Sequence, residues 1–214
     1  MKTITFAFFA SLVISTCHVA FASEPADVSG YMHNVEVEEG ARLLAELTGK
    51  TVVVCSHVSG FTFNWEGHNL TLSQAIRQVE SSFCGRSPCG LVNINDKYYK
   101  VVPLSQTNSP AETPHIDILI RNQSISVENQ PVTLDRLAER VGQHMNADTE
   151  VWVIGAWTRV DENGRRPDQT ETNDHVRFES ILSALRTAKV SPENIYIVCQ
   201  SRSKHLQAAD TSPN

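Results

Sequence analysis

A ten-residue stretch with no apolar periodicity, 105–114, divides this chain of 214 residues into two parts. It reads SQTNSPAETP, so it contains two prolines and no hydrophobic residue at helical or strand spacing. This composition is typical of an interdomain linker. The flanking parts, 31–104 and 115–200, each carry their own helix and strand patterns. The sequence therefore predicts two small domains, each with its own hydrophobic core.

The first part has a helical pattern that ends at Gly49, and a second helix that begins with a capping box of Thr71 and Gln74. Between and after the helices lie β-branched or alternating runs bounded by turn residues, which predict strands. The expected order is helix, strand, strand, helix, strand, strand, with a further strand near 31–37. The strands are expected at 51–55, 61–65, 91–94 and 98–102, the last two joined by the turn Asn95-Asp96-Lys97.

The second part begins with a predicted hairpin, in which isoleucines alternate with polar residues. Two helical stripes and two strongly apolar strand candidates follow it. The expected elements are strands at 116–120 and 124–127, a helix at 134–145, a strand at 151–157, a helix at 174–187 capped by Asp174, and a strand at 195–199. Both parts thus predict an α+β fold, with a mixed or antiparallel sheet packed by two helices in each domain.

Three segments of the first part, 40–54, 58–60 and 72–76, form an ordered set of motifs. The first is a helix ending in Thr-Gly that leads into a valine-rich strand, the second a short glycine turn, and the third the start of a helix reading LSQAI. In this order they resemble the short N-terminal domain (STN domain) shared by secretins and TonB-dependent receptors. The resemblance implies a periplasmic docking module over 31–104.

The second part is similar in pattern to the periplasmic domain of ExbD and TolR proteins, through segments 125–133, 176–190 and 195–198. These proteins couple inner-membrane motors to TonB or Tol partners. Their transmembrane helix with its proton-handling carboxylate has no counterpart here, so no motor function is implied. A peptidoglycan-binding OmpA-like domain is the alternative for 115–200. Its ligand-gripping Asp and Arg would fall near Arg159 and Ser180, which are the wrong residue types.

The first 22 residues have the features of an export signal. Lys2 precedes an apolar stretch of about a dozen residues, too short to span a membrane, and Ala20-Phe21-Ala22 forms a small-x-small cleavage site. No second long apolar run follows, so no transmembrane segment is expected. The predicted product is a soluble periplasmic protein, ending in a polar, flexible tail at 201–214.

Cysteine placement suits an oxidising compartment. Removal of the signal with Cys17 leaves four of the five cysteines. Cys84 and Cys89 enclose the short loop GRSP, which favours a disulfide between them. Cys55 and Cys199 lie in apolar runs, which favours buried thiols, although the sequence leaves open whether they are free or bridged. The C-x4-C spacing lacks a second cysteine or histidine pair, so no metal site is expected.

Charge and motifs point to a non-catalytic function. The chain has 18 basic and 24 acidic residues, with a net charge of −6 and no basic block, which excludes a typical nucleic-acid binder. No nucleotide, hydrolase or metalloprotease motif occurs, and no cofactor is expected. We therefore expect a protein-protein interaction module of an envelope assembly for secretion, conjugation or Ton/Tol-type coupling.

The expected partner is an envelope protein such as a secretin or a Ton/Tol component. Strand addition at a sheet edge is the expected mode of contact, and the last strand, with Ile195, Tyr196, Ile197 and Val198, is the candidate edge. Edge strands would also allow a homodimer.

The alternative is a peptidoglycan-binding protein or a small secreted cell-wall hydrolase. It rests on the polar loop 159–174, where Asp161, Asp168 and the following His175 offer acid and base groups. A solvated loop explains the same residues.

Overall fold

The computed structural model describes residues 28–85, 89–108, 112–121, 124–146, 148–155 and 169–200, without the side chains of 84–85, 121 and 169–177. The proposed signal at 1–22, most of the polar loop and the tail at 201–214 lie outside these ranges.

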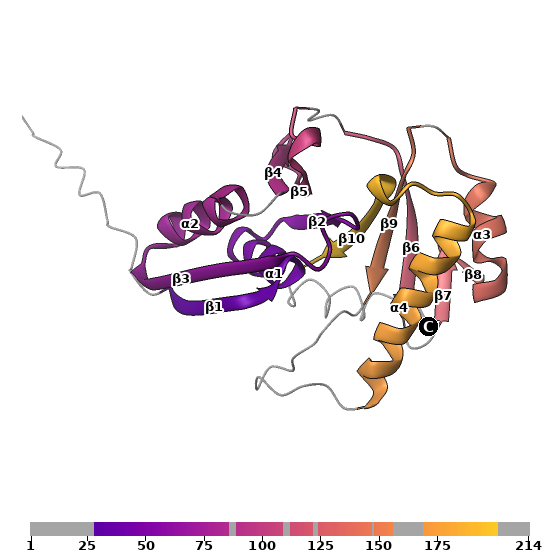
Figure 1. The fold of residues 1–214 in the computed structure, drawn as a ribbon, viewed down its shortest axis with the longest axis horizontal. Coiled ribbons are helices and arrows are strands. Elements are labelled where there is room, and N and C mark those ends of the chain that lie inside the picture. The colour runs from indigo at the N-terminus through magenta and orange to yellow at the C-terminus, as the bar shows by residue number, and fades with distance from the viewer. Residues whose placement is uncertain are drawn as a thin grey trace, which may run out of the picture.

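The described residues form helices, strands and two short 3-10 turns, which confirms the α+β class (Figure 1). The strands are β1 (Val28–Glu36), β2 (Thr51–Cys55), β3 (Thr62–Leu70), β4 (Cys89–Ile94), β5 (Tyr98–Pro103), β6 (His115–Arg121), β7 (Ser124–Val127), β8 (Gln130–Val132), β9 (Glu150–Gly155) and β10 (Ile195–Cys199). The helices are α1 (Val37–Thr48), α2 (Leu72–Gly85), α3 (Leu134–Gly142) and α4 (Gln169–Thr187).

Several elements end where the sequence predicts. Gly49 adopts φ 66° and caps α1, its N–H donating to the Ala45 carbonyl over 2.9 Å, as expected of a residue with no Cβ. At α2 the Thr71 N–H donates to Gln74 Oε1 at 2.9 Å and the Gln74 N–H donates to Thr71 Oγ1 at 3.3 Å. The predicted capping box is therefore confirmed.

Helix α4 departs from the expected boundary, because it begins at Gln169 rather than at Asp174. Asp174 therefore lies inside the helix and does not cap its start. The predicted polar loop is correspondingly shorter. Strand β8 was not expected. It follows a turn in which Glu128 and Asn129 have φ 49° and 63°.

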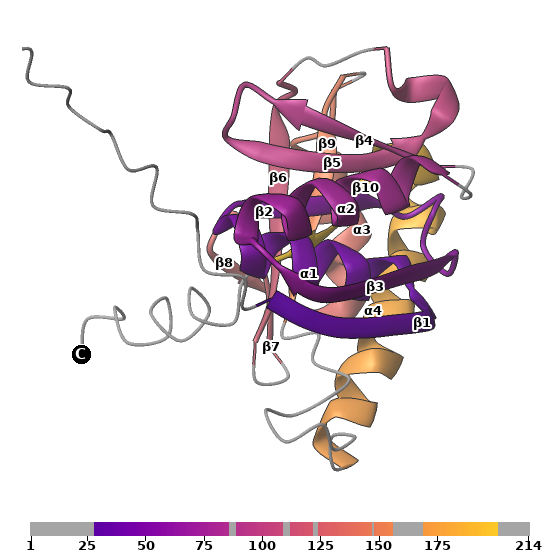
Figure 2. The same ribbon diagram turned by 90° about the vertical axis from the view of Figure 1, so that its left-hand side faces the viewer.

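The strands form a two-stranded ribbon, β1–β3, and an eight-stranded sheet with the order β4-β5-β2-β10-β9-β6-β7-β8. Helices α1 and α2 pack between the ribbon and the sheet (Figure 2). Helix α3 packs against α4 and against β7 and β8 at the other end of the sheet. Both parts of the chain thus contribute strands to one sheet, instead of each part having a separate one.

Strand β10 is the element that joins the two parts. It pairs antiparallel with β2 from the first part and parallel with β9 from the second. Its five residues are all buried. The prediction that Ile195–Val198 forms an exposed edge is therefore wrong, since both sides of this strand are already hydrogen-bonded. Continuous apolar runs such as those of β2 and β10 are typical of strands that are buried on both faces of a sheet.

Side chains of β5 and β9 meet although β2 and β10 lie between these strands in the sheet order. The Lys100 Nζ lies 2.5 Å from Glu150 Oε1, and Thr113, from the predicted linker, bonds to both groups. The Glu150 Oε2 accepts a bond from the Trp152 indole N–H at 3.0 Å. We call this group of four residues the clasp. Its contacts join β5 of the first part to β9 of the second across β2 and β10.

Candidate functional site

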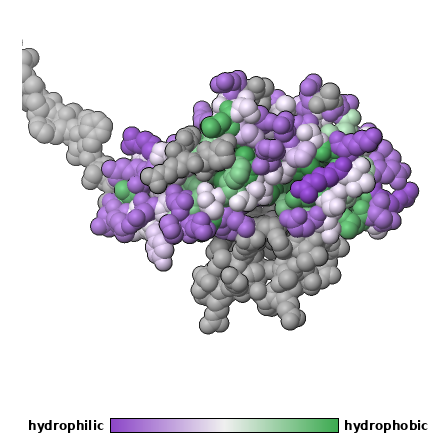
Figure 3. Space-filling view, in the orientation of Figure 1, coloured by the Kyte–Doolittle hydropathy of each residue, from purple (hydrophilic) through white to green (hydrophobic). Residues whose placement is uncertain are grey.

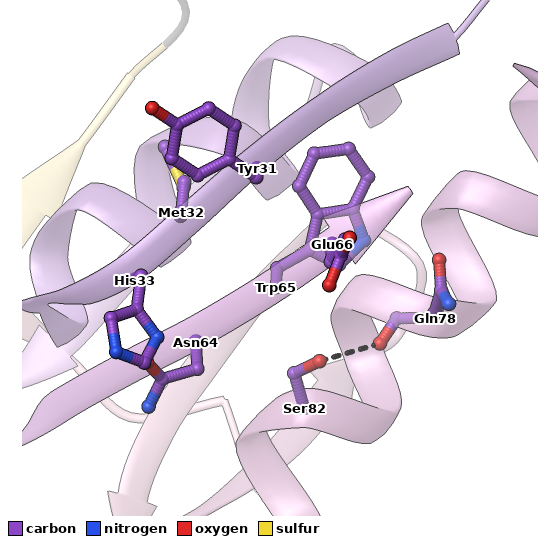
Figure 4. A pocket seen from close by; sticks show the side chains of 8 residues that line it. All are labelled: Tyr31, Met32, His33, Asn64, Trp65, Glu66, Gln78 and Ser82. Carbon is purple, nitrogen blue, oxygen red and sulfur yellow. Dashed lines mark hydrogen bonds between the residues drawn. The ribbon is translucent and has the colours of Figure 1, made fainter. Parts of the chain in front are cut away.

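A hollow of about 500 Å³ lies where the ribbon meets helix α2. Figure 4 shows strand β3 running between β1 and the helix, with Gln78 and Ser82 on the helix facing it. We call this the ribbon hollow. Its lining side chains all come from β1, β3 and α2: Tyr31, Met32, His33, Asn64, Trp65, Glu66, Gln78 and Ser82.

Trp65 is the central side chain of the ribbon hollow. The period-two pattern of β3 turns Phe63, Trp65 and Gly67 inward, and Trp65 is only 6% exposed. A Cβ on Gly30 would lie 3.2 Å from the indole, and one on Gly67 would lie 2.6 Å from it, so the two glycines leave the space that the ring fills. Among the described residues the buried indole N–H has no hydrogen-bond acceptor. A buried donor without a partner costs free energy, so this atom is a candidate contact point for a bound group.

The ribbon offers backbone groups beside this donor. Because the sheet contains only β1 and β3, each strand has one edge that pairs with no described strand. Strand β1 bulges after Met32, where Asn34 has φ 54° and its N–H donates to Asn64 Oδ1 at 2.7 Å. Tyr31, the residue before Met32 in β1, is 80% exposed. An exposed aromatic ring beside an unpaired edge is typical of a contact surface.

Hydrophobic surface elsewhere is scattered. In Figure 3, green hydrophobic areas are interspersed with purple hydrophilic side chains. Besides Tyr31, the large apolar side chains that are clearly exposed within the described ranges are Leu72, Leu104 and Leu134, from three different elements. A docking partner would therefore have to use a recessed hollow or a strand edge, because these residues do not form one broad apolar patch.

A second hollow, of about 220 Å³, lies on the face of the eight-stranded sheet that carries the clasp. We call it the seam hollow, because strands of both parts of the chain build it. Its lining side chains are Thr51, Lys97, Tyr98, His115, Asp117, Trp152, Ile154, Val198 and Gln200. The imidazole of His115 stacks on Trp152 with ring centres 3.8 Å apart, and Tyr98 meets the same indole edge-on at 5.1 Å. Packed aromatic rings give this hollow stiff walls.

The seam hollow has perturbed titrating groups. Burial raises the pKa of Tyr98 to about 12, with the Glu150 carboxylate as the second cause. Burial also raises the pKa of Asp117 above its ordinary value, while nearby His115 opposes that rise and Glu128 adds to it. Both groups are therefore held toward their neutral forms by their surroundings.

The cysteines divide into two pairs. Cys55 and Cys199 are free and buried, in agreement with the expectation of buried thiols, and burial raises their pKa values to about 11 and about 12. The Cys89 sulfur is also buried, 3.7 Å from the Phe83 carbonyl. The side chain of Cys84 lies outside the described residues, so the Cys84–Cys89 disulfide stays a prediction.

The other candidate site residues from the sequence are either buried in the sheet or outside the described residues. Ile195, Tyr196, Ile197 and Val198 are core residues of the sheet, and of these only Val198 lines a hollow. Asp161, Asp168 and the side chain of His175 lie outside the described residues. Trp65 and Trp152 are buried.

The sequence interpretation missed the two hollows. For Trp65 the available signal was its inward position in an alternating strand, two residues before Gly67. For Tyr98 and Asp117 no local signal exists, because only the long-range pairing of the sheet brings them together.

No family model, curated protein or solved structure matches this chain. Among the described residues, none of the helices combines the length and the apolar character that a membrane crossing requires. In the same part of the chain, no three His, Cys, Asp or Glu side chains are grouped so that they could hold a metal ion.

Proposed function

We propose that this chain is a non-catalytic periplasmic adaptor that captures an extended segment of an envelope protein at the ribbon hollow. The observation that carries the proposal is the buried Trp65 N–H without an acceptor, beside an edge of β3 that pairs with no described strand. The resemblance of 31–104 to the STN domain supports the periplasmic setting. The partner class is an envelope assembly component such as a secretin or a Ton/Tol component.

The hollow indicates what the captured segment must supply. An extended backbone adds to the strand edge through its own N–H and C=O groups, and one of its carbonyls accepts from the Trp65 indole. An apolar side chain enters the hollow against Trp65 and Met32. Glu66, whose Oε1 lies 3.0 Å from His68 Nε2, forms a polar rim. Such a segment alternates apolar and polar side chains.

Other edges are less suited to this contact. Strand β10 is paired on both sides, so it is no longer a candidate. Strand β8, at one end of the large sheet, has three residues and contains Pro131. A short edge strand with proline resists the addition of another strand. The ribbon is thus a better docking edge than β8 or β10.

Site-specific photo-crosslinking tests this assignment. Benzoylphenylalanine replaces Gln78, which lines the ribbon hollow, or Ser81, which is exposed on the same helix and does not line it. The protein is irradiated in intact envelopes, and crosslinked partners are identified by mass spectrometry. We expect a crosslink to one envelope component from position 78 and little or none from position 81.

A blocking variant complements the crosslinks. Gln78→Arg places a long charged side chain in the hollow, and Ser81→Arg is its matched control. We expect Gln78→Arg to reduce recovery of the crosslinked partner about tenfold and Ser81→Arg to leave it unchanged. Equal crosslinking from both positions would reject the adaptor contact at this site. Cosedimentation with purified sacculi, without any protein partner, would also reject it and would favour the peptidoglycan-binding alternative.

A further inference from the structure

The seam hollow has two buried oxygen atoms that lack hydrogen-bond partners. The Tyr98 hydroxyl and Asp117 Oδ1 are both inaccessible to solvent and unpaired among the described residues. Tyr98 as a whole is 7% exposed and lines the hollow together with Asp117. A carboxylate only accepts hydrogen bonds, and a phenol accepts them as well as donating one. A ligand that donates several hydrogen bonds would therefore satisfy both unpaired oxygens.

The charges around the hollow determine the sign of that ligand. Lys100 is paired with Glu150, and Lys97 lies 2.9 Å from Glu112, so both ammonium groups are neutralised. The basic group that accompanies Asp117 among the described side chains is His115, whose Nε2 is 3.7 Å from Asp117 Oδ1, beyond hydrogen-bond distance. Glu128 adds negative charge, with its Oε1 accepting from the Asp117 N–H at 2.8 Å. The region therefore attracts a cation.

The walls determine the shape of the ligand. Trp152 and Val198 are buried apolar side chains that line the hollow from β9 and β10. They suit a short aliphatic stem, whereas the two oxygens suit a head group with donors spread in a plane. A guanidinium has five donors in a flat fork and matches two acceptors at once. The volume of about 220 Å³ is sufficient for one such side chain.

We propose that the seam hollow binds a guanidinium group on an aliphatic chain, with Asp117 and the Tyr98 hydroxyl as its acceptors. The guanidinium comes from an arginine side chain of a peptide or from a small free molecule, and the chemistry of the head group is the same in both. This site is separate from the ribbon hollow. Its failure or success is independent of the adaptor proposal.

A titration followed by nuclear magnetic resonance tests the site. The indole N–H of Trp152 reports on the hollow, because this ring forms one of its walls. The probe is N-acetylarginine amide added to the purified protein. N-acetylcitrulline amide is the control ligand, because it has nearly the same shape without the charge. We expect a saturable shift of the Trp152 signal with the arginine compound, and at least about tenfold weaker binding of the citrulline compound.

Variants localise the binding. Asp117→Asn should weaken binding about tenfold and Tyr98→Phe about threefold. Glu139→Gln, which removes an exposed carboxylate of α3 away from the hollow, should not change it. Unchanged amide spectra of each free variant show that folding is intact. If Asp117→Asn does not fold, the Tyr98→Phe variant and the citrulline control decide the question.

Agmatine separates the two ligand sources. Tighter binding of an arginine peptide than of agmatine indicates a partner's side chain, and the reverse indicates a small free molecule. Either order supports the guanidinium site. No saturable shift at about 50 mM probe, equal binding of the citrulline compound, or unchanged binding by Asp117→Asn and Tyr98→Phe would overturn it.

Discussion

The ribbon hollow and the seam hollow are built in opposite ways. The ribbon hollow uses residues between 31 and 82, from a strand, its partner strand and the helix that follows. The seam hollow uses residues between 51 and 200, from five strands of both parts of the chain and from two residues that flank them, Lys97 and Gln200. The first is a product of local packing, whereas the second exists only when β10 has paired with β2. The two should therefore respond differently to changes that weaken the seam.

Breaking the clasp should produce the largest difference. In Lys100→Met the buried Glu150 carboxylate loses its cationic partner, which should lower the free energy of unfolding by about 3–5 kcal/mol. Lys97→Met is the control, because its pair with Glu112 is exposed and should contribute at most about 1 kcal/mol. Urea unfolding curves measure both values.

The double variant Lys100→Met/Glu150→Gln completes this test. It removes both charges and should recover much of the loss. A loss below about 1 kcal/mol in the single variant would show that the clasp does not hold the two parts together.

Thiol reactivity tests how tightly the seam strands β2 and β10 are packed. Cys55 in β2 and Cys199 in β10 have raised pKa values, so their thiolate fractions at pH 8 should be about 100-fold or more below that of an ordinary cysteine. We expect neither to react with iodoacetamide in the native protein. In denaturant without a reductant, the exported chain should take up two labels if the Cys84–Cys89 bridge is present. Four labels, counted by mass spectrometry, would disprove that bridge.

Space at the ribbon hollow is tested by a glycine variant. A Cβ at Gly67 would lie 2.6 Å from the Trp65 ring and 2.7 Å from Leu70, so Gly67→Ala should destabilise the protein by about 1–3 kcal/mol. Gly142→Ala adds the same methyl group where nothing lies within 4 Å, and should be neutral or slightly stabilising. Thermal unfolding compares the two. Equal effects would show that the Trp65 ring is not held tightly by the ribbon.

Asp117→Asn should have the smallest effect on stability. Because the pKa of Asp117 is raised in the folded state, its ionised form opposes folding, and this penalty is fully present at pH values above the folded pKa. The side chain is 46% exposed, so solvent screening reduces the penalty to about a few tenths of a kcal/mol. The variant should therefore be slightly more stable than the parent at pH 7.

The pH dependence checks the sign of this effect. As the pH falls through the folded pKa toward the ordinary value, Asp117 protonates and the difference between variant and parent should disappear. Besides burial, His115 lowers and Glu128 raises the pKa of Asp117, and so they shift the pH range of this effect. Urea unfolding at pH 7 and near pH 4 measures it, and a less stable variant at pH 7 would contradict it.

Local signals in the sequence predicted most of the elements. The Asn95-Asp96 turn is correct, with φ 49° and 57° at these residues, because such turns require left-handed backbone that Asn and Asp tolerate. The inward positions of Phe63 and Trp65 follow from strand alternation. These features depend on neighbours a few residues away, and each has a residue type that fits its local conformation.

The seam was not predicted, for a physical reason. Apolar runs such as those of β2 and β10 indicate that a strand is buried, but they do not indicate which strands pair with it. A terminal strand was interpreted as an edge because of its position in the chain. The structure places it between β2 and β9, where it joins the two parts of the chain in one sheet. Similarly, nothing in the local sequence around Lys100 or Glu150 indicates that their side chains form an ion pair.

The position of β10 determines when this protein can finish folding. Its contacts with the first part span long stretches of chain, such as the 161 residues that separate Cys199 from Glu38, whose carbonyl lies near the Cys199 thiol. Closing such a long loop slows folding, because chain entropy must be overcome before the contact forms. Until the C-terminal strand arrives, β2 keeps an unpaired valine-rich edge that can associate with other chains. A nascent or truncated chain that lacks β10 should therefore aggregate more readily than the finished protein.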